Sequence, residues 1–287
     1  MDTTHQLTKP VPPSWSPPLT SWEISLRSSG SSERTVDTRL RHVRQLARGF
    51  WDTAPRDVTD DALLTWCARK KWMPETRHSY YASFQGFFHW NSEHTSCNDP
   101  SMVLPVVRRP ASPPHPTPED ILHQARLDSD RRTCLILDIA ACLGLRAGEI
   151  ARIHKQDITQ DLVGLSLNVH GKGGKTRIIP MPEWLGYQLL RECTANGGFA
   201  FPGQDNGHLS ARWISKLGSM ALPSPWTLHS LRHRFATLAY GAERDLLTVQ
   251  RLLGHSSVAT TQRYASPPEA AMRAAIAAAD LHLVVTA

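Results

Sequence analysis

The chain has 287 residues, of which 40% are hydrophobic and 20% charged. This is the composition of a soluble globular protein, long enough for two domains that each have a core. Lysine and arginine outnumber aspartate and glutamate by 32 to 26, a modest basic excess that favours a polyanionic partner without naming one. No apolar run reaches the roughly 18 residues that a membrane span needs, and the polar, proline-rich N-terminus is unlike a signal peptide.

The five cysteines are odd in number, and no two of them have the C-x-x-C spacing. This pattern disfavours a disulfide framework and the usual zinc or redox motifs. We therefore expect reduced thiols in a cytoplasmic protein that needs no metal and no cofactor.

The N-terminal part of the chain predicts a leader followed by a helical domain. Five prolines within residues 1–20 disfavour helix and strand alike, so we expect an extended segment there. Apolar residues then recur every three or four positions along 36–50, as on one face of a helix. Thr-Asp-Asp at 59–61 is a good helix start, and spaced aromatic residues predict another helix over 75–90. Residues 21–97 should therefore form a small all-helical domain.

Basic side chains lie mostly off the apolar faces of this expected domain. They could contact DNA or simply be solvated, and a charged helix face is weak evidence for either alternative. The candidates for DNA contact here are Arg39, Arg41, Arg44, Arg48, Lys70, Lys71 and Arg77.

A proline-rich stretch predicts the boundary between two domains. Residues 98–118 hold seven prolines, so we expect an extended linker over 98–116. Thr117, Pro118 and the acids that follow are suited to be a helix N-cap, a first-position proline and first-turn acids. The second domain is therefore expected over 117–287.

The second domain is predicted to be mostly helical with one small antiparallel sheet. Apolar residues alternate over 163–169, the period of a half-buried strand. A glycine-rich turn at 171–174 leads to a returning strand over 176–181, which together make a β-hairpin. Helices are expected over 131–142, 147–154, 184–195, 228–240, 245–253, 258–264 and 268–281.

Two short segments of this domain carry basic residues suited to phosphate binding. Gly-Leu-Arg-Ala-Gly-Glu at 144–149 places Arg146 between two helices, with Glu149 one turn further on. Gly-Lys-Gly-Gly-Lys at 171–175 presents Lys172 on the hairpin turn, without the spacing of a Walker A loop. Taken singly, each residue is more often a solvated surface side chain than a phosphate ligand.

Two further segments carry histidines and a tyrosine. His229 and Arg232 lie three apart, so they share one face of a helix. His229 and His233 also have the spacing of a helical zinc pair, but no glutamate follows His229 and no third ligand is evident. The segment from Gly254 to Tyr264 predicts a helix stop, a loop with His255 and a short helix; simple packing of these helices is the alternative.

Taken in order, these four segments resemble the tyrosine recombinase (phage integrase) family, and its small integrase and Xer-like members in particular. The resemblance covers roughly residues 117–266, and the helical unit before it is similar to the family's core-binding domain in size and place, though without a sharp motif. It implies a fold that is mainly α with a small antiparallel β-hairpin sheet, in which two domains clamp duplex DNA.

The resemblance also implies a reaction. Arg146 and Arg232 would grip the non-bridging oxygens of the scissile phosphate while Tyr264 attacks phosphorus, leaving a 3′-phosphotyrosyl link. His229 would help to take the tyrosine proton, and Lys172 would protonate the leaving 5′-oxygen. Arginine is a permanent bidentate donor suited to phosphate oxygens, and a tyrosine with an ordinary pKa near 10 needs such a positive site or a base.

Three further positions complete the implied site. His255 would hydrogen-bond the phosphate, Glu149 would support the active site from behind, and the hairpin would add DNA contacts through Lys175 and Arg177. The implied catalytic set is Arg146, Lys172, His229, Arg232, His255 and Tyr264.

The implied partners are double-stranded DNA recombination sites and further copies of the chain, four in all, which exchange strands through a Holliday junction. The resemblance leaves room for a host or phage accessory protein that bends DNA or sets direction, and implies a location on the nucleoid when DNA is bound. Because only about 20 residues precede the first helical unit, we expect an enzyme that uses simple core sites. The alternatives are a type IB topoisomerase and a non-catalytic DNA-binding regulator.

Overall fold

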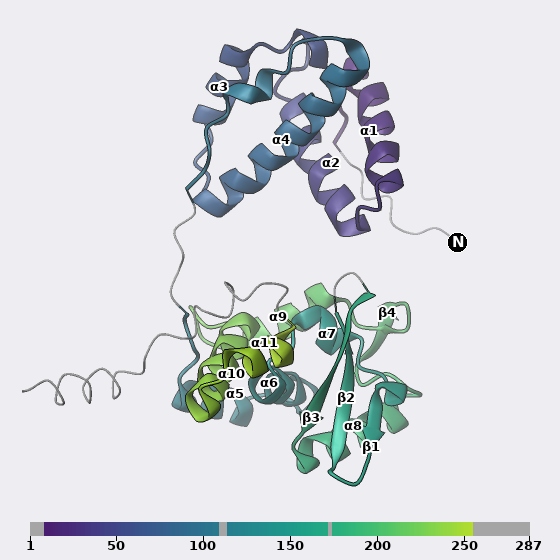
Figure 1. Ribbon diagram of the computed structural model, residues 1–287, viewed down its shortest axis with the longest axis vertical. Helices are drawn as coiled ribbons and strands as arrows, with labels where there is room; N and C mark the ends of the chain where they lie inside the picture. The colour runs from purple at the N-terminus through teal and green to yellow at the C-terminus, as the bar shows by residue number, and fades with distance from the viewer. Residues whose placement is uncertain (1–8, 109–113, 172–173, 255–287) are drawn as a thin grey trace, which may run out of the picture. The chain divides into compact units, whose positions relative to one another are not determined.

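The computed structural model describes residues 9–108, 114–171 and 174–254 of the chain. The chain divides into two compact units, Met1–Ala111 and Ser112–Ala287, and each is described here by itself (Figure 1). The border between the units falls within the segment predicted as a linker, 98–116.

The described part of the first unit is entirely helical. Its core is rich in aromatic rings: Trp15 stacks on Phe87 with ring centroids 5.6 Å apart, and Trp22 meets Phe87 edge to face. Thr59 caps a helix as predicted, because its hydroxyl oxygen accepts a hydrogen bond from the backbone N–H of Ala62. The elements are η1 (Pro13–Trp15), α1 (Ser16–Ser28), α2 (Glu33–Ala47), η2 (Pro55–Asp57), α3 (Asp60–Ala68), α4 (Pro74–Thr95) and η3 (Pro100–Val103).

Two boundaries predicted from proline content are wrong. Residues 13–20 are helical, because Pro17 and Pro18 lie in the first turn of α1, where backbone N–H groups have no partner within the helix anyway. Trp15 and Leu19 are buried there. The start of the predicted linker is likewise structured, since η3 forms and Leu104 joins the core of the first unit.

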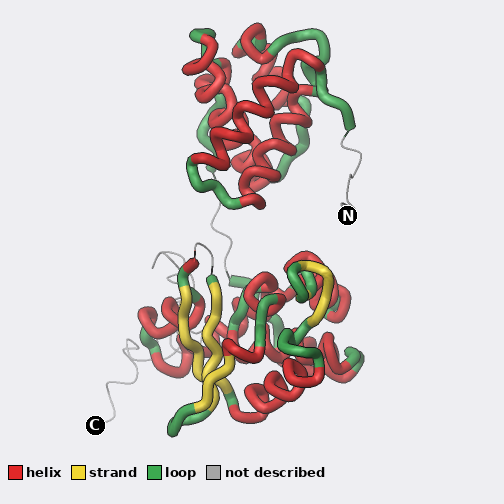
Figure 2. The backbone as a smooth tube through the Cα atoms, turned by 90° about the vertical axis from the view of Figure 1, so that its right-hand side faces the viewer, coloured by secondary structure: helices red, strands yellow, loops and turns green. Residues whose placement is uncertain are grey.

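The second unit is mostly helical with a small antiparallel sheet, which confirms the predicted fold class. The sheet has three strands in the order β1-β2-β3, so the expected hairpin gains an edge strand that alternation did not reveal; Figure 2 shows the strands side by side. Its helices are α5 (Glu119–Leu127), α6 (Arg131–Leu143), α7 (Ala147–Ala151), η4 (Lys155–Asp157), α8 (Glu183–Ala195), α9 (Ala211–Ala221), α10 (Leu228–Glu243) and α11 (Leu246–Leu253), and its strands are β1 (Ile158–Gln160), β2 (Leu165–His170), β3 (Thr176–Met181) and β4 (Pro202–Asp205).

Several predicted helices are close to those observed, and the differences have local causes. α7 ends at Ala151 rather than at 154, because the chain turns through η4 into β1. α9 and β4 were not predicted. The helices predicted over 258–264 and 268–281 lie outside the described residues.

One face of the sheet is buried against the helices. Leu165, Leu167 and Val169 of β2 point to this face, and α8 approaches it so closely that a Cβ at Gly186 would lie 2.6 Å from Leu165. Residues that pair across an antiparallel ladder share a face. The partner of Val169 in the ladder is Arg177, so this arginine is on the inner side of the sheet.

The entry of the chain into the second unit differs from the prediction. The N-cap of α5 is Pro118, and Thr117 makes no cap. Thr117 is buried instead, and it is tied to Ser230 in the first turn of α10 by a contact of 2.7 Å between the two hydroxyl oxygens. In the part of the chain that the structure describes, no helix has the length and apolar character needed to cross a bilayer.

Candidate active site

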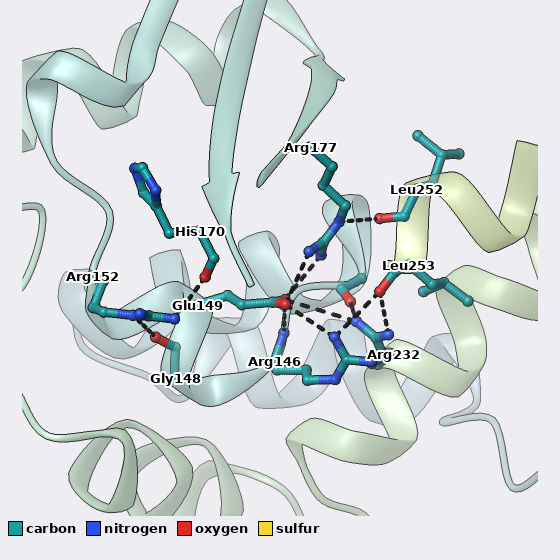
Figure 3. A network of polar contacts seen from close by, with 10 residues as sticks. Arg146, Gly148, Glu149, Arg152, His170, Arg177, Arg232, Leu252 and Leu253 are labelled. Atoms are coloured by element: carbon teal, nitrogen blue, oxygen red, sulfur yellow. Dashed lines mark hydrogen bonds and ion pairs between the residues drawn. The ribbon is translucent and has the colours of Figure 1, made fainter. Parts of the chain in front are cut away.

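A buried carboxylate, that of Glu149 on α7, is the centre of the polar network drawn in Figure 3. Its side chain is only 4% exposed. Oε1 accepts hydrogen bonds from Nη1 of Arg146 and Nη1 of Arg177, both at 3.0 Å. Oε2 accepts from the backbone N–H of Arg146 at 2.8 Å and from Nη2 of Arg177 at 3.0 Å. Nη1 of Arg232 lies 3.9 Å from Oε2, so three guanidinium groups surround one carboxylate.

The local sequence explains why Arg146 and Glu149 meet. Gly144 ends α6 in the left-handed conformation, with φ of 62°, which glycine adopts without strain. Arg146 is then the N-cap of α7 in extended conformation, and Glu149, three residues on, reaches back to its backbone N–H. The backbone N–H of Glu149 donates in turn to the carbonyl oxygen of Arg146 at 2.8 Å. The carboxylate thus supplies the glutamate half of a capping box, and this contact fixes it beside the guanidinium.

The carboxyl end of α11 docks onto the same arginines. The carbonyl oxygen of Leu253 accepts from Nη2 of Arg232 at 2.7 Å and from Nη1 of Arg146 at 3.4 Å. The carbonyl oxygen of Leu252 accepts from Nε of Arg177 at 2.8 Å. The last carbonyls of a helix carry partial negative charge and lack partners within it, so cationic donors stabilise this end.

The two predicted phosphate-binding arginines differ in exposure. The side chain of Arg146 is 45% exposed, whereas that of Arg232 is 2% exposed. Arg232 also donates to the carbonyl oxygen of Gly144 at 2.5 Å. Arg146 thus reaches solvent, whereas Arg232 is buried in the interior of the domain.

His229 stands in the first turn of α10, one helical turn before Arg232. The residue is exposed, and its ring meets that of His233 edge to face with centroids 4.5 Å apart. Partial desolvation of the ring, followed by the positive charges of Arg232 and Arg146, lowers the pKa of His229 below its ordinary value. A neutral imidazole at pH 7 can accept a proton.

Burial and hydrogen bonding shift the pKa of Glu149 in opposite directions. Desolvation by itself raises the pKa of this carboxyl, but the hydrogen bonds from Arg177 and from the backbone N–H of Arg146, together with the charges of both arginines, outweigh it. The pKa of Glu149 is therefore below its ordinary value, and the group is an anion among three cations.

The structure brings together part of the predicted site. Arg146, Glu149 and Arg232 form one cluster. The charges of both arginines contribute to the lowered pKa of His229. The predicted catalytic residues Lys172, His255 and Tyr264 lie outside the described residues.

Arg177, a predicted DNA contact, is less exposed than a surface contact would be. Its side chain is 13% exposed, and its guanidinium bonds Glu149 and Leu252 inside the domain. The sequence held a signal for this, since strand alternation puts Arg177 on the same face as the buried Ile179 and Met181. Lys175, the other hairpin candidate, is exposed.

The basic candidates of the first unit have varied surroundings. Arg44 lies 3.9 Å from Glu23, and Arg48 donates to the backbone carbonyls of residues 9 and 10. The ammonium of Lys70 lies 4.1 Å from the centre of the Trp66 ring, a cation–π contact. Arg41 and Lys71 are exposed, whereas Arg39 and Arg77 are half-buried.

His229 and His233 have the spacing of a helical zinc pair. Among the residues that the structure describes, no three His, Cys, Asp or Glu side chains lie close enough together to hold an ion.

Comparison with known proteins identifies the family. Residues 118–270 match the Phage integrase family. The chain belongs to this family. The match lies within the second unit and contains all four segments that carry the resemblance.

Curated members of the phage integrase family are similar to this chain over different lengths. Tyrosine recombinase XerC of Methylobacterium sp. (strain 4-46) is 37% identical over 160 residues, which is 52% of this chain and 49% of that protein. The chain therefore spans about half the length of this relative. Tyrosine recombinase XerD of Ralstonia nicotianae is 28% identical over 283 residues, or 90% of this chain and 92% of that protein.

Solved structures support the fold of this family member. A lambda integrase tetramer bound to a Holliday junction matches with a TM-score of 0.71 at 17% identity, covering 87% of this chain and 76% of that one. The XerH site-specific recombinase bound to a palindromic difH substrate matches with a TM-score of 0.68 at 18% identity, covering 86% and 80%. At such identities the likeness concerns the fold alone.

Proposed function

We propose that this phage integrase family member is a site-specific DNA recombinase that cuts and rejoins strands through a covalent link to Tyr264. The observation that carries the proposal is the cluster of Arg146 and Arg232 around Glu149, next to the end of α11. With Arg177, which also pairs with Glu149, the cluster holds three cations and one anion, and its net charge is positive by two. Such a site suits the pentavalent phosphate of a phosphoryl transfer, which is catalysed mainly by positioning and charge neutralisation.

Each residue has a part in the proposed reaction. The phenol oxygen of Tyr264 attacks phosphorus, and the bond from phosphorus to the 5′-oxygen breaks. The phenol proton passes to His229, whose lowered pKa keeps it neutral and able to accept, and Lys172 supplies a proton to the leaving oxygen. Arg146 neutralises the phosphate. The phosphotyrosine keeps the energy of the phosphodiester, so the reverse step rejoins DNA without ATP.

Arg232 and His255 complete the proposed phosphate site. In the described structure Arg232 is 2% exposed and bonds two carbonyl oxygens. Contact with the scissile phosphate would use another of the five N–H groups of the guanidinium or take the place of one of these carbonyl oxygens. Glu149, held by two hydrogen-bonded arginines, fixes the geometry from behind.

The first unit is proposed to be the core-binding domain, joined by a linker to the catalytic domain so that both grip one DNA site. Its exposed basic side chains would contact phosphates, which predicts binding that weakens steeply with salt. The proposed partners are recombination sites in double-stranded DNA and three further copies of the chain, with or without an accessory protein. This activity suits a small integrase or an Xer-like resolvase in the cytoplasm, on nucleoid DNA.

The decisive experiment is covalent trapping. Wild type and Tyr264→Phe are each incubated in EDTA with nicked DNA that carries the candidate site, and the products are separated on a denaturing gel. We expect a slow protein–DNA band for wild type alone. No band on a site that the protein demonstrably binds would favour a non-catalytic regulator, and a band with Tyr264→Phe would mean that another residue is the nucleophile.

A supercoiled plasmid without a recombination site distinguishes the topoisomerase alternative. A type IB topoisomerase relaxes such a plasmid without sequence preference. We expect relaxation and covalent complex only on DNA that carries the site.

A further inference from the structure

One arginine connects three separate pieces of the second unit. Arg177 projects from β3, pairs with Glu149 of α7 through two hydrogen bonds, and donates from Nε to the carbonyl oxygen of Leu252 in α11. The three elements are far apart in the chain, because Arg177 lies 28 positions from Glu149 and 75 positions from Leu252. Figure 3 shows the side chain lying between the carboxylate and the end of α11.

The geometry uses the shape of the guanidinium group and not only its charge. Nη1 and Nη2 each lie 3.0 Å from a different oxygen of Glu149, which is the two-point pairing that a planar fork makes with a carboxylate. Nε, on the third side, is 2.8 Å from Leu252. A lysine ammonium carries the same charge but cannot make these three directed contacts at once.

The packing around Arg177 leaves it little freedom. A Cβ added to Gly254 would lie 2.8 Å from Nη1 of Arg177, so the guanidinium rests directly against the residue that ends α11. Gly254 is in the left-handed conformation, with φ of 62°. The end of α11 therefore packs closely against the guanidinium of Arg177, with no room for a side chain at Gly254.

Exposure separates Arg177 from its neighbour on the hairpin. Lys175 is exposed, while the side chain of Arg177 is 13% exposed. Glu149 and Leu252 take three of the five N–H groups of Arg177, so most of its donor capacity is used inside the domain.

We propose that Arg177 is a positioning residue for strand cleavage, which holds Glu149, and through it Arg146, in register with the end of α11, and that it does not bind DNA itself. This rests on the proposed recombinase function. Arg177 sets where Arg146 stands because both arginines share Oε1 of Glu149. It also sets where α11 ends, and the chain continues from there into His255.

The test separates DNA binding from chemistry in the full-length protein. Wild type, Arg177→Gln, Arg177→Lys and Lys175→Gln are compared on nicked site DNA. Affinity and its salt dependence are measured by titration, and the rate of covalent complex formation is measured with all DNA bound. Thermal unfolding of each protein checks that it is folded.

We expect Arg177→Gln to bind DNA with nearly the wild-type salt dependence and to form the covalent complex about 10- to 100-fold more slowly, the usual effect of a small misplacement of reacting groups. Arg177→Lys, which keeps the charge, should fold and should also be slowed. Lys175→Gln should differ from Arg177→Gln in binding, with weaker affinity and a shallower salt dependence.

A double-substitution cycle tests whether Arg177 acts through Glu149. The rate loss for Glu149→Gln combined with Arg177→Gln should be smaller than the product of the two single losses, because both substitutions disturb the same contact between Arg177 and Glu149. Effects that multiply would mean that Arg177 acts independently of Glu149.

The outcomes distinguish the two levels of the proposal. If wild type forms no covalent complex, the recombinase function and the role of Arg177 fall together. If wild type is active and Arg177→Lys cleaves at the wild-type rate, charge alone suffices and the positioning role is wrong. If Arg177→Gln loses affinity and salt dependence as Lys175→Gln does, Arg177 is a DNA contact after all. A Gln variant that does not fold leaves the decision to Arg177→Lys.

Discussion

The hydroxyl oxygens of Thr117 and Ser230 lie 2.7 Å apart, and both side chains are buried. The backbone N–H of Thr117 also donates to the carbonyl oxygen of Ser230 at 3.3 Å. Ser230 stands between His229 and Arg232 in the first turn of α10. The point where the chain enters the second unit is thus fastened to the helix that presents two of the proposed catalytic residues.

Replacing Thr117 by valine should destabilise the protein by about 1 kcal/mol, the net value of one buried hydrogen bond. Ser230 keeps its contacts with Thr227, so the helix cap should survive. The measurement is urea unfolding monitored by tryptophan fluorescence. Thr194→Val, at an exposed position of α8, is the matched control and should change stability by less than about 0.5 kcal/mol. Equal effects of the two substitutions would show that the Thr117 contact contributes nothing.

The sequence predicted the elements of the second unit better than their connections. α6 was predicted from its apolar run, which is buried along most of its length, and β3 was predicted as the strand that returns after the glycine-rich turn. The Thr117 contact could not be predicted, since Thr117 and Ser230 are 113 residues apart and a threonine before Pro-Glu-Asp suits a helix cap equally well. The first unit shows the same limit: proline content says where a helix does not continue, but α1 begins with its prolines.

Gly144→Ala should destabilise the protein by more than the usual cost of placing an alanine in the left-handed conformation. Gly144 has φ of 62°, and an added Cβ would lie 2.4 Å from the ring of Phe235. The left-handed conformation costs about 1 kcal/mol for alanine, and overpacking adds about 1–3 kcal/mol. We expect a lower midpoint in urea together with slower cleavage, because the carbonyl oxygen of Gly144 also accepts from Arg232.

Gly197→Ala is the control for this substitution. Gly197 has φ of 73°, and a Cβ there would meet nothing within 4 Å. Only the conformational cost of about 1 kcal/mol should remain, with no loss of cleavage. If Gly144→Ala and Gly197→Ala prove equally stable, the ring of Phe235 moves aside freely and the steric argument is wrong.

The candidate site was predicted as a set of residues but not as a network. The order of the motifs was enough to select Arg146, Glu149 and Arg232, which lie together in the structure. The burial of Arg177 was not predicted, because a basic residue on a hairpin was expected to be exposed. Its pairing partner Val169 is one of the alternating apolar residues that predicted the buried face of the strand. The strand pattern therefore already indicated that Arg177 is on the buried side.

His229 should titrate below its ordinary pKa of 6.5. Partial desolvation and then the charges of Arg232 and Arg146 disfavour its protonated form, and the ring of His233 is the other titratable neighbour in contact with it. Because the neutral imidazole is the form that accepts a proton, the cleavage rate should stay constant as pH falls to 6.5 and decline only below it. The titration is followed by NMR of the ring protons, with His229→Gln to assign the signal. Arg146→Gln should move the midpoint upward, and a midpoint at or above 6.5 in wild type would contradict the proposed charge environment.

Glu149→Gln should lower stability at pH 7 by about 3 kcal/mol, because three arginines then face a neutral group in a buried site. The effect should depend on pH. The pKa of Glu149 is lowered in the folded protein, so its ionised form contributes stability above the ordinary value of 4.5, and that contribution is lost as pH falls through the folded-state pKa. The difference in urea stability between wild type and Glu149→Gln should therefore narrow below pH 4.5.

Asp130 and Asp245, whose pKa values are also lowered, are present in both proteins and cancel in this difference. Glu183→Gln, at an exposed position in the first turn of α8, should give a small and nearly constant difference. A gap for Glu149→Gln that stays the same from pH 7 to pH 3 would mean that its carboxylate is not the charge that holds the arginines together.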